Sequence, residues 1–120
     1  MPLREPAVVL VVEDHLDTRE LYVQSLQAAG FRCVMAEFAD EALKQLQEVR
    51  VDAVVMDLGL PRLEGGLALA WRLRGRAESV PIIAVTGHPR ERLPDKLFSG
   101  YLMKPIDLDA LVRTVAELTP

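Results

Sequence analysis

Polar side chains that could share one site follow four apolar runs of this 120-residue sequence. Glu13 and Asp14 follow "AVVLVV", Asp57 follows "DAVVM", Thr86 follows "PIIAV" and Lys104 follows "YLM". A carboxylate at the end of a buried run loses part of its hydration, which costs free energy unless a partner compensates it. The sequence therefore raises the question of whether these groups compensate one another.

These residue types suit a divalent cation and a phosphoryl group. Closely packed carboxylates repel one another, so either some of them bind protons or a cation lies among them. Oxygen ligands without His or Cys favour a hard ion, and a site with few protein ligands suits Mg²⁺. A carboxylate such as Asp57 can attack phosphorus, while the Thr86 hydroxyl and the Lys104 ammonium bond phosphoryl oxygens. The set therefore predicts phosphoryl transfer to Asp57.

The strands and helices that must position these residues can be predicted from the sequence, in which apolar runs alternate with segments of helical periodicity. The β-type runs are 7–12, 32–37, 52–56, 81–85 and 101–103, and residues between them recur at i, i+3, i+4 and i+7. Gly30 is a candidate C′ residue of the first helix and Asp107 a candidate N-cap of the last. The pattern predicts an α/β fold, a doubly wound five-stranded parallel sheet with helices on both faces. Ligands of such sheets bind at the carboxyl ends of the strands.

Length and composition narrow the class of protein. At 120 residues the chain fits one domain, 1–120, with enough apolar residues to bury a core. A net charge of -4 without a basic cluster argues against direct nucleic acid binding. The single cysteine, Cys33, excludes an internal disulfide and a cysteine-based zinc site. The start lacks a signal-peptide profile and no apolar run could span a bilayer, so we expect a cytoplasmic protein that does not contact membranes.

Four motifs carry a resemblance to a known family. "VLVVEDH", "VVMDLGLPRLEGG", "AVTG" and "YLMKPID" occur in the order and approximate spacing of the receiver domain of two-component response regulators. The chain resembles that family over nearly its whole length, which implies the CheY-like strand order 2-1-3-4-5. The resemblance implies that Asp57 is the phosphoacceptor and that Glu13 and Asp14 form the acidic pair. It also implies that Asp14, Asp57 and the Gly59 carbonyl contact Mg²⁺.

The same resemblance assigns roles to the later motifs. It implies that Thr86 and Lys104 contact the phosphoryl group, that the Lys104-Pro105 bond is cis, and that Tyr101 is an aromatic switch residue coupled to Thr86. The implied function is a phosphorylation-dependent signalling switch rather than an enzyme, although a receiver assists its own phosphorylation and dephosphorylation. The implied partners are a histidine kinase or phosphotransfer protein and an unidentified downstream protein.

This sequence differs from the usual pattern of the receiver family in two places. Gly59 and His88 occupy positions that flank the phosphoryl group, and since Gly59 has no side chain we hypothesise that His88 and solvent access set the rate of phosphoryl loss. The segment "TGHPRERLPDKLFSGYLMK" is shorter than is usual in receivers and contains Pro89 and Pro94. Because proline breaks a helix interior, we expect the fourth helix of the family to be short, displaced or largely unwound.

Other interpretations remain open for single residues and for the whole chain. Taken alone, an acidic pair or a Thr-Gly pair after a strand is often a turn, and a lone lysine is usually a surface charge. Tyr101 could be a core residue with a hydrated hydroxyl, and Trp71 is expected in the core, with a partner surface as the alternative. The functional alternative is a degenerate receiver that binds proteins independently of phosphorylation.

Overall fold

The fold consists of five strands and four helices in the part of the chain that can be described. We analysed a computed structural model that describes residues 5–59, 63–76, 79–87, 93–94 and 96–120. The strands are β1 (Val8–Val12), β2 (Arg32–Ala36), β3 (Ala53–Asp57), β4 (Ile82–Thr86) and β5 (Gly100–Met103). The helices are α1 (Leu16–Ala28), α2 (Ala39–Glu48), α3 (Leu63–Arg76) and α4 (Leu108–Leu118).

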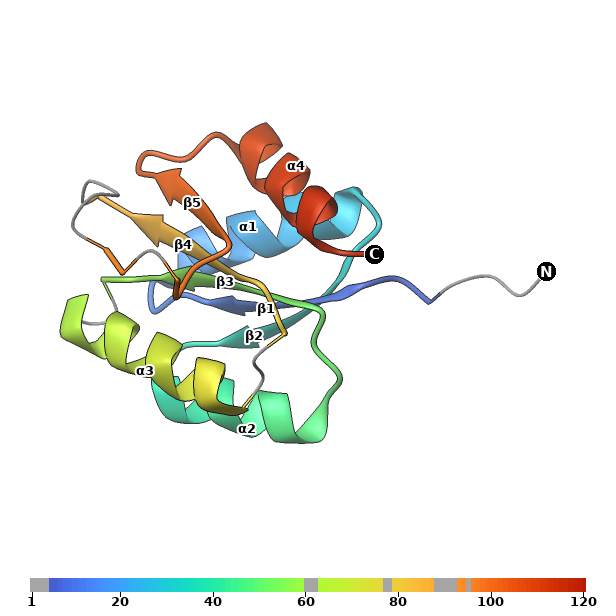
Figure 1. Cartoon of the computed structure of the whole chain (residues 1–120). Coiled ribbons are helices and arrows are strands. Elements are labelled where there is room, and N and C mark those ends of the chain that lie inside the picture. Colours follow the sequence, from blue (N-terminus) through green and yellow to red (C-terminus); the bar gives the residue numbers. More distant parts are fainter. Residues whose placement is uncertain (1–4, 60–62, 77–78, 88–92, 95) are drawn as a thin grey trace.

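All five strands form one parallel sheet in the order β2-β1-β3-β4-β5. Helices α1 and α4 cover one face of the sheet and α2 and α3 cover the other (Figure 1). The predicted doubly wound α/β fold and its strand order are therefore confirmed. The register pairs Asp57 of β3 with Val85 of β4, and Thr86 of β4 with Met103 of β5, so the ends of these strands lie side by side.

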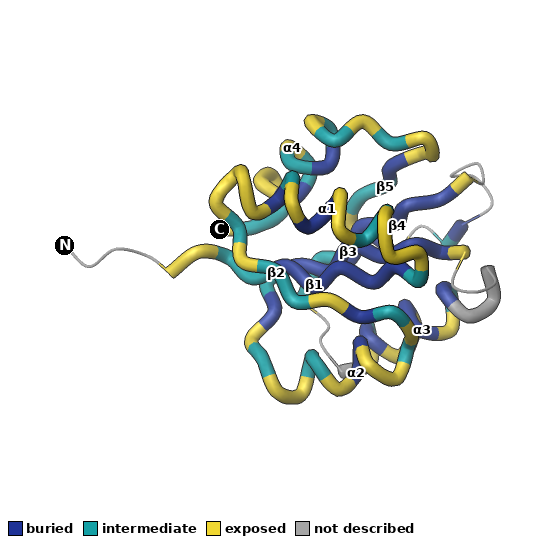
Figure 2. Tube along the Cα trace, turned by 180° about the vertical axis from the view of Figure 1, so that it is seen from behind, coloured by how far each residue is buried: buried dark blue, intermediate teal, exposed yellow. Residues whose placement is uncertain are grey.

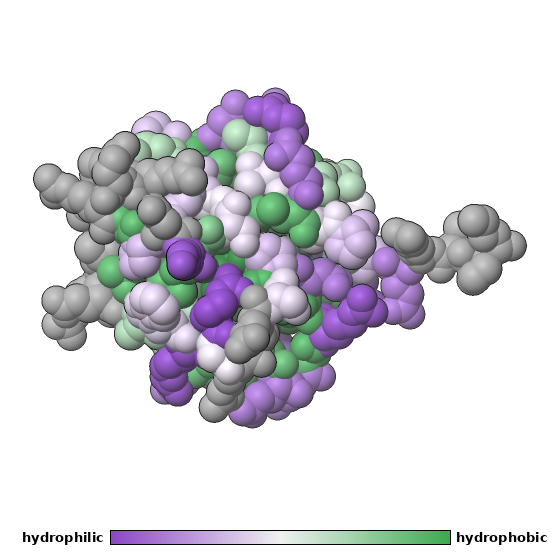
Figure 3. Space-filling model, viewed as in Figure 1, coloured by the Kyte–Doolittle hydropathy of each residue, from purple (hydrophilic) through white to green (hydrophobic). Residues whose placement is uncertain are grey.

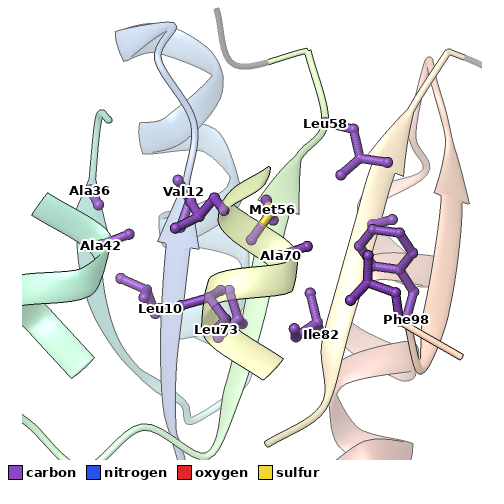
Figure 4. Close-up of a cluster of buried hydrophobic side chains, with 14 of the residues drawn as sticks. Leu10, Val12, Ala36, Ala42, Met56, Leu58, Ala70, Leu73, Ile82 and Phe98 are labelled. Atoms are coloured by element: carbon purple, nitrogen blue, oxygen red, sulfur yellow. The ribbon is translucent and has the colours of Figure 1, made fainter. Parts of the chain in front are cut away.

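The sheet is buried on both faces, which explains the continuous apolar runs. Every residue of β3 and of β4 is buried, whereas the edge strands β2 and β5 are partly exposed (Figure 2). Leu10, Met56 and Ile82 point toward Ala70 and Leu73 of α3 (Figure 4). The residues that alternate with these along the strands point to the other face of the sheet. Among them, Val9, Val55 and Ile83 pack against α1 and α4. On the face shown in Figure 3, strongly hydrophilic residues are interspersed with hydrophobic ones, including in the middle of the face.

Both predicted helix caps are present in the structure, whereas one predicted core residue is exposed. The Asp107 carboxylate accepts a hydrogen bond from the Asp109 N–H, and Gly30 follows α1 with a φ of 99°, so both predicted caps are confirmed. The prediction that Trp71 lies in the core is wrong, because its side chain is 57% exposed. Helix α3 packs through Ala70 and Leu73, which turns Trp71 outward.

The segment between β4 and β5 departs from a regular helical crossover. None of its described residues is helical, while residues 88–92 and 95, and with them His88 and Pro89, lie outside the described part. Leu93, Leu97 and Phe98 are buried against the α2/α3 face. The Arg74 guanidinium of α3 donates to the Leu97 carbonyl at 2.9 Å. The described residues of this segment are thus held by apolar packing and by α3.

A close approach between α3 and the end of β3 depends on Gly66. A Cβ atom at this position would lie 2.5 Å from the Leu58 carbonyl oxygen and 2.6 Å from the Leu58 Cα, both backbone atoms next to Asp57. Nothing lies within 4 Å of a Cβ at Gly75, on the same helix. Only glycine at position 66 therefore lets α3 sit beside the residue that follows Asp57.

We predict opposite effects of alanine at these two glycines. Gly66→Ala should lower the free energy of unfolding by about 1–3 kcal/mol, because the added methyl group displaces backbone. Gly75→Ala should raise it by about 0.5–1 kcal/mol, because alanine favours helix. Urea unfolding followed by circular dichroism measures both. Equal stability of the two variants would show that α3 does not approach Leu58 this closely.

Candidate functional site

The carboxyl ends of four strands bring the predicted site residues together. Glu13 and Asp14 follow β1, Asp57 ends β3, Thr86 ends β4 and Lys104 follows β5. A cavity of about 790 Å³ opens at this edge of the sheet. Its lining is Glu13, Asp14, His15, Thr18, Leu21, Tyr22, Asp57, Gly59, Lys104, Pro105, Ile106 and Leu108. The convergence expected for a parallel sheet therefore holds for Glu13, Asp14, Asp57 and Lys104. Thr86, at the end of β4, is not among the residues that line the cavity.

Three carboxylates form the acidic part of this cavity, which we call the acid pocket: Glu13, Asp14 and Asp57. One oxygen from each can be chosen so that all three lie within 4.8 Å of one another. The residues Glu13 and Asp57 are buried, with 3% and 5% of their surface exposed, and Asp14 is partly exposed. Like charges this close and this poorly hydrated cannot all be ionised without a compensating positive charge.

Asp57 obtains that compensation from Lys104 and from the backbone. The Lys104 Nζ lies 2.8 Å from Asp57 Oδ2, and the Gly59 N–H donates to Asp57 Oδ1 at 2.8 Å. Burial acts to raise the pKa of Asp57, but hydrogen bonds from Glu13, Lys104 and Gly59 together with the Lys104 charge outweigh it and hold the pKa below its ordinary value. Asp57 is therefore the anionic member of the pocket.

The pKa of Glu13 shifts in the opposite direction to that of Asp57. Burial, and then the hydrogen bond to Asp57 and the Asp57 charge, raise the pKa of Glu13 to about 8. Glu13 Oε1 accepts from the His15 N–H at 3.2 Å, whereas Oε2 is buried with no donor among the described residues. In the absence of a cation, a proton on Glu13 makes it a donor to Asp57 and removes one of the repelling charges.

Lys104 is positioned by the end of the β4–β5 ladder. Its N–H donates to the Thr86 carbonyl at 2.8 Å, and the bond between Lys104 and Pro105 is cis, as the family resemblance implied. Among the described residues that line the cavity, Lys104 is the only lysine or arginine. The Lys104 side chain is 42% exposed, so its ammonium group has room to move away from Asp57.

Thr86 and Tyr101, the two expected switch residues, lie on neighbouring strands. Thr86 is 3% exposed. Tyr101 is partly buried on the α2/α3 face, with its ring edge-on to Phe98 at a centroid distance of 5.7 Å. Its hydroxyl donates to the Pro94 carbonyl at 3.3 Å, so it is tied to the β4–β5 segment. His88, the other residue expected to flank a phosphoryl group, lies outside the described residues.

The sequence did not indicate Tyr22, which lines the cavity from α1. Tyr22 is 5% exposed and packs with Val23 and Leu26 in the core between α1, α4 and the sheet. A tyrosine at a core position of a helix follows the same periodicity as an aliphatic residue, so spacing alone could not single it out. The available signal was its hydroxyl, which a core position does not require.

The ligand set of the acid pocket fits a hard divalent cation. Every candidate side-chain ligand is a carboxylate oxygen, and no histidine or cysteine belongs to the cluster. Glu13 Oε2 is an unsatisfied acceptor inside the pocket, which a cation or its bound water would satisfy. The pocket also opens to a cavity with room for water and a phosphoryl group.

Comparison with known proteins identifies similar sequences. The family model described as "Response regulator receiver domain" matches residues 9–116. The chain is 34% identical over 117 residues to the response regulator MprA of Mycolicibacterium vanbaalenii, covering 94% of this chain and 50% of MprA. It is 31% identical over 113 residues to the sensor histidine kinase RcsC of Salmonella typhi, covering 91% of this chain and 12% of the kinase. The chain therefore spans half or less of these relatives.

Solved structures agree with the fold over most of the chain. The response regulator TrrA of Thermotoga maritima, in complex with Mg(2+)-BeF, superposes with a TM-score of 0.83 at 30% identity, covering 93% of this chain and 98% of TrrA. The chemotaxis protein CheY4 of Vibrio cholerae gives a TM-score of 0.86 at 25% identity, covering 94% of this chain and 98% of CheY4. None of the described helices has the length and apolar character needed to cross a bilayer.

The opposite pKa shifts of Glu13 and Asp57 predict a pH dependence of stability. With metal removed by a chelator, folded Glu13 keeps its proton up to about pH 8, whereas unfolded Glu13 loses it near 4.5. The contribution of protonated Glu13 to the stability of the folded protein is therefore fully present below pH 4.5 and is lost as the pH rises to about 8. Asp57, whose pKa is lowered from 3.8, changes charge only below this window.

Glu13→Gln removes this titration while keeping a side chain that can donate to Asp57. The free energy of unfolding of the variant, minus that of the wild type, should grow by about 1–3 kcal/mol between about pH 5 and about pH 8. Urea unfolding in chelator at several pH values measures the difference. Parallel pH profiles of the two proteins would mean that Glu13 is ionised throughout.

Proposed function

Because the chain belongs to the response regulator receiver domain family, we propose that it is a phosphorylation-dependent signalling switch with Asp57 as its phosphoacceptor. The observation that carries this proposal is the 2.8 Å ion pair between Lys104 and the buried, anionic Asp57 inside the acid pocket. An ionised carboxylate has the lone pairs that a nucleophile needs. Its neighbours supply the positive charge and the hydrogen bonds that a phosphoryl group requires.

The proposed cation is Mg²⁺, held by the side chains of Glu13, Asp14 and Asp57 and by the Gly59 carbonyl. When bound, Mg²⁺ neutralises charge that develops on the transferring phosphoryl group. The carboxylate-only cluster and the unsatisfied Glu13 Oε2 support this assignment. The Mg(2+)-BeF complex of TrrA, a 30% identical protein, supports it independently.

The proposed transfer makes one bond and breaks one bond. An Asp57 carboxylate oxygen forms a P–O bond while the P–N bond of a phosphohistidine breaks, and the imidazole nitrogen keeps the electron pair. Lys104 moves from Asp57 Oδ2 to a phosphoryl oxygen, which its half-exposed side chain permits. The Thr86 hydroxyl bonds another phosphoryl oxygen. The chain thus assists its own phosphorylation without acting on a separate organic substrate.

The proposed response couples Thr86 to Tyr101. As Thr86 moves toward the phosphoryl group, Tyr101 turns inward, an equilibrium between two conformations that phosphorylation biases. This turn breaks the hydrogen bond from the Tyr101 hydroxyl to the Pro94 carbonyl. The signal would therefore reach the shortened β4–β5 segment directly.

The proposed partners follow from the family. They are a sensor histidine kinase or phosphotransfer protein as donor and a downstream protein as receiver of the signal, with no direct nucleic acid or membrane contact by this domain. We propose a cytoplasmic location. We further propose that His88 and solvent access set the rate at which phosphorylated Asp57 loses its phosphoryl group, since the Gly59 position offers no shielding side chain.

Mass spectrometry tests the proposed function. Incubation with acetyl phosphate and Mg²⁺ should add one phosphoryl group to the wild-type protein and none to Asp57→Asn, whose amide cannot attack phosphorus. Asp40→Asn, a substitution in the first turn of α2, should be phosphorylated like the wild type. If Asp57→Asn gains the same mass, Asp57 is not the phosphoacceptor. If no protein gains any, the alternative of a receiver that binds proteins independently of phosphorylation is favoured.

A further inference from the structure

Arg19 is the one arginine of α1, and the proposed transfer does not use it. Its half-buried guanidinium donates from Nη1 to the Glu13 carbonyl oxygen at 2.8 Å. Arg19 does not line the cavity at the acid pocket, and it forms no ion pair with any described residue. The side chain therefore holds the backbone of the acidic pair from outside the pocket and does not neutralise a carboxylate directly.

The backbone of Glu13 is held through both its N–H and its carbonyl group. The N–H donates to the Ala36 carbonyl at the end of β2 at 3.1 Å, and the carbonyl accepts from Arg19. A hydrogen bond from a charged donor is shorter and stronger than one from a neutral donor. Because the peptide group is planar, holding this carbonyl also fixes the plane of the Glu13–Asp14 peptide and the direction in which Asp14 leaves it.

Asp14 depends on this backbone more than Asp57 does. The Asp57 carboxylate accepts hydrogen bonds from a lysine and from a backbone N–H, whereas the Asp14 carboxylate accepts none from the described residues. The start of α1 adds no side-chain support, because His15 at its N-cap makes no capping hydrogen bond. The placement of the Asp14 carboxylate in the acid pocket therefore follows from the orientation of the peptide that Arg19 holds.

We propose that Arg19 is a positioning residue of the acid pocket, which holds the Glu13 carbonyl and so orients the side chains of Glu13 and Asp14 for Mg²⁺. The inference rests on the proposed function, because it assumes that the acid pocket binds the cation. It adds a contributor on α1 to a site otherwise built from the ends of the strands. Residues that orient metal ligands in this way contribute strongly to metal affinity without contacting the metal.

The charge of Arg19 and its hydrogen bond have opposite effects on Mg²⁺ binding. A positive charge near the pocket repels a cation, so removal of the charge alone would strengthen Mg²⁺ binding. Loss of the hydrogen bond to the Glu13 carbonyl frees the acidic pair and weakens Mg²⁺ binding. Weaker binding after removal of the guanidinium therefore reports lost positioning and not lost charge.

Arg19→Met removes the donors and the charge and keeps an unbranched apolar side chain. Isothermal titration calorimetry with MgCl₂ should show an affinity about tenfold weaker than that of the wild type. Arg113→Met makes the same change in net charge at an exposed residue of α4 and should leave the affinity unchanged. Should Arg19→Met fail to fold, Arg19→Gln replaces it with the same expectation, because its uncharged amide is too short to reach the carbonyl as arginine does.

A second measurement separates positioning from a general loss of structure. The rate of phosphorylation by acetyl phosphate should require more Mg²⁺ for half saturation in Arg19→Met, while the rate at saturating Mg²⁺ stays that of the wild type. A residue that only stabilised the fold would lower the rate at every Mg²⁺ concentration and leave the half-saturating concentration unchanged.

The outcomes distinguish this inference from the proposed function. If Arg19→Met binds Mg²⁺ as tightly as the wild type, or more tightly, Arg19 does not position the acidic pair and the proposed function stands. A lower saturating rate with an unchanged half-saturating Mg²⁺ concentration would overturn the inference in the same way. If the wild type itself binds no Mg²⁺, the proposed metal site fails, and the inference fails with it.

Discussion

The structure depends on one electrostatic constraint, the placement of three carboxylates around one ammonium at the carboxyl edge of a parallel sheet. All five strands point the same way, so the polar residues that follow them meet at one edge. Lys104 neutralises Asp57, and a proton on Glu13 removes a second charge when no cation is present. This arrangement keeps Asp57 ionised inside a nearly buried site, which is the condition for using it as a nucleophile.

The rest of the fold holds these groups in place. Apolar layers on both faces of the sheet bury the strands up to the residues that carry the charges. Gly66 lets α3 pack directly on the backbone beyond Asp57, and Arg74 ties α3 to the segment that precedes β5. The short connection between β4 and β5 therefore still delivers Lys104 to the pocket, since Leu97 and Phe98 fill space on the α2/α3 face.

Much of this could be predicted from the sequence because strand patterns and strand ends are local signals. Continuous apolar runs identified the buried strands, and the polar residues after four of the five runs identified the site. Tyr22 could not be found in this way, since a tyrosine in the core has the spacing of an aliphatic residue. Trp71 was expected in the core because α3 is apolar on more than one face, and only packing decides which face is buried.

The protonation of Glu13 was also beyond sequence reasoning. The sequence shows that carboxylates crowd together, but the distance between them, their burial and the position of Lys104 decide which one accepts the proton. The same reasoning applies to Tyr101, whose hydroxyl donates to the Pro94 backbone carbonyl in the β4–β5 segment. Local patterns identify the participants, and tertiary packing assigns their charges and partners.

The need for further positive charge in the acid pocket is tested most directly by urea unfolding as MgCl₂ is added at constant ionic strength. A cation that binds only the folded protein raises the free energy of unfolding in proportion to the logarithm of its concentration above its dissociation constant. The wild type should gain about 1 kcal/mol at a concentration roughly five times that constant, and Asp57→Asn should gain less. A wild-type stability that does not change with Mg²⁺, or an equal gain in Asp57→Asn, would contradict the account.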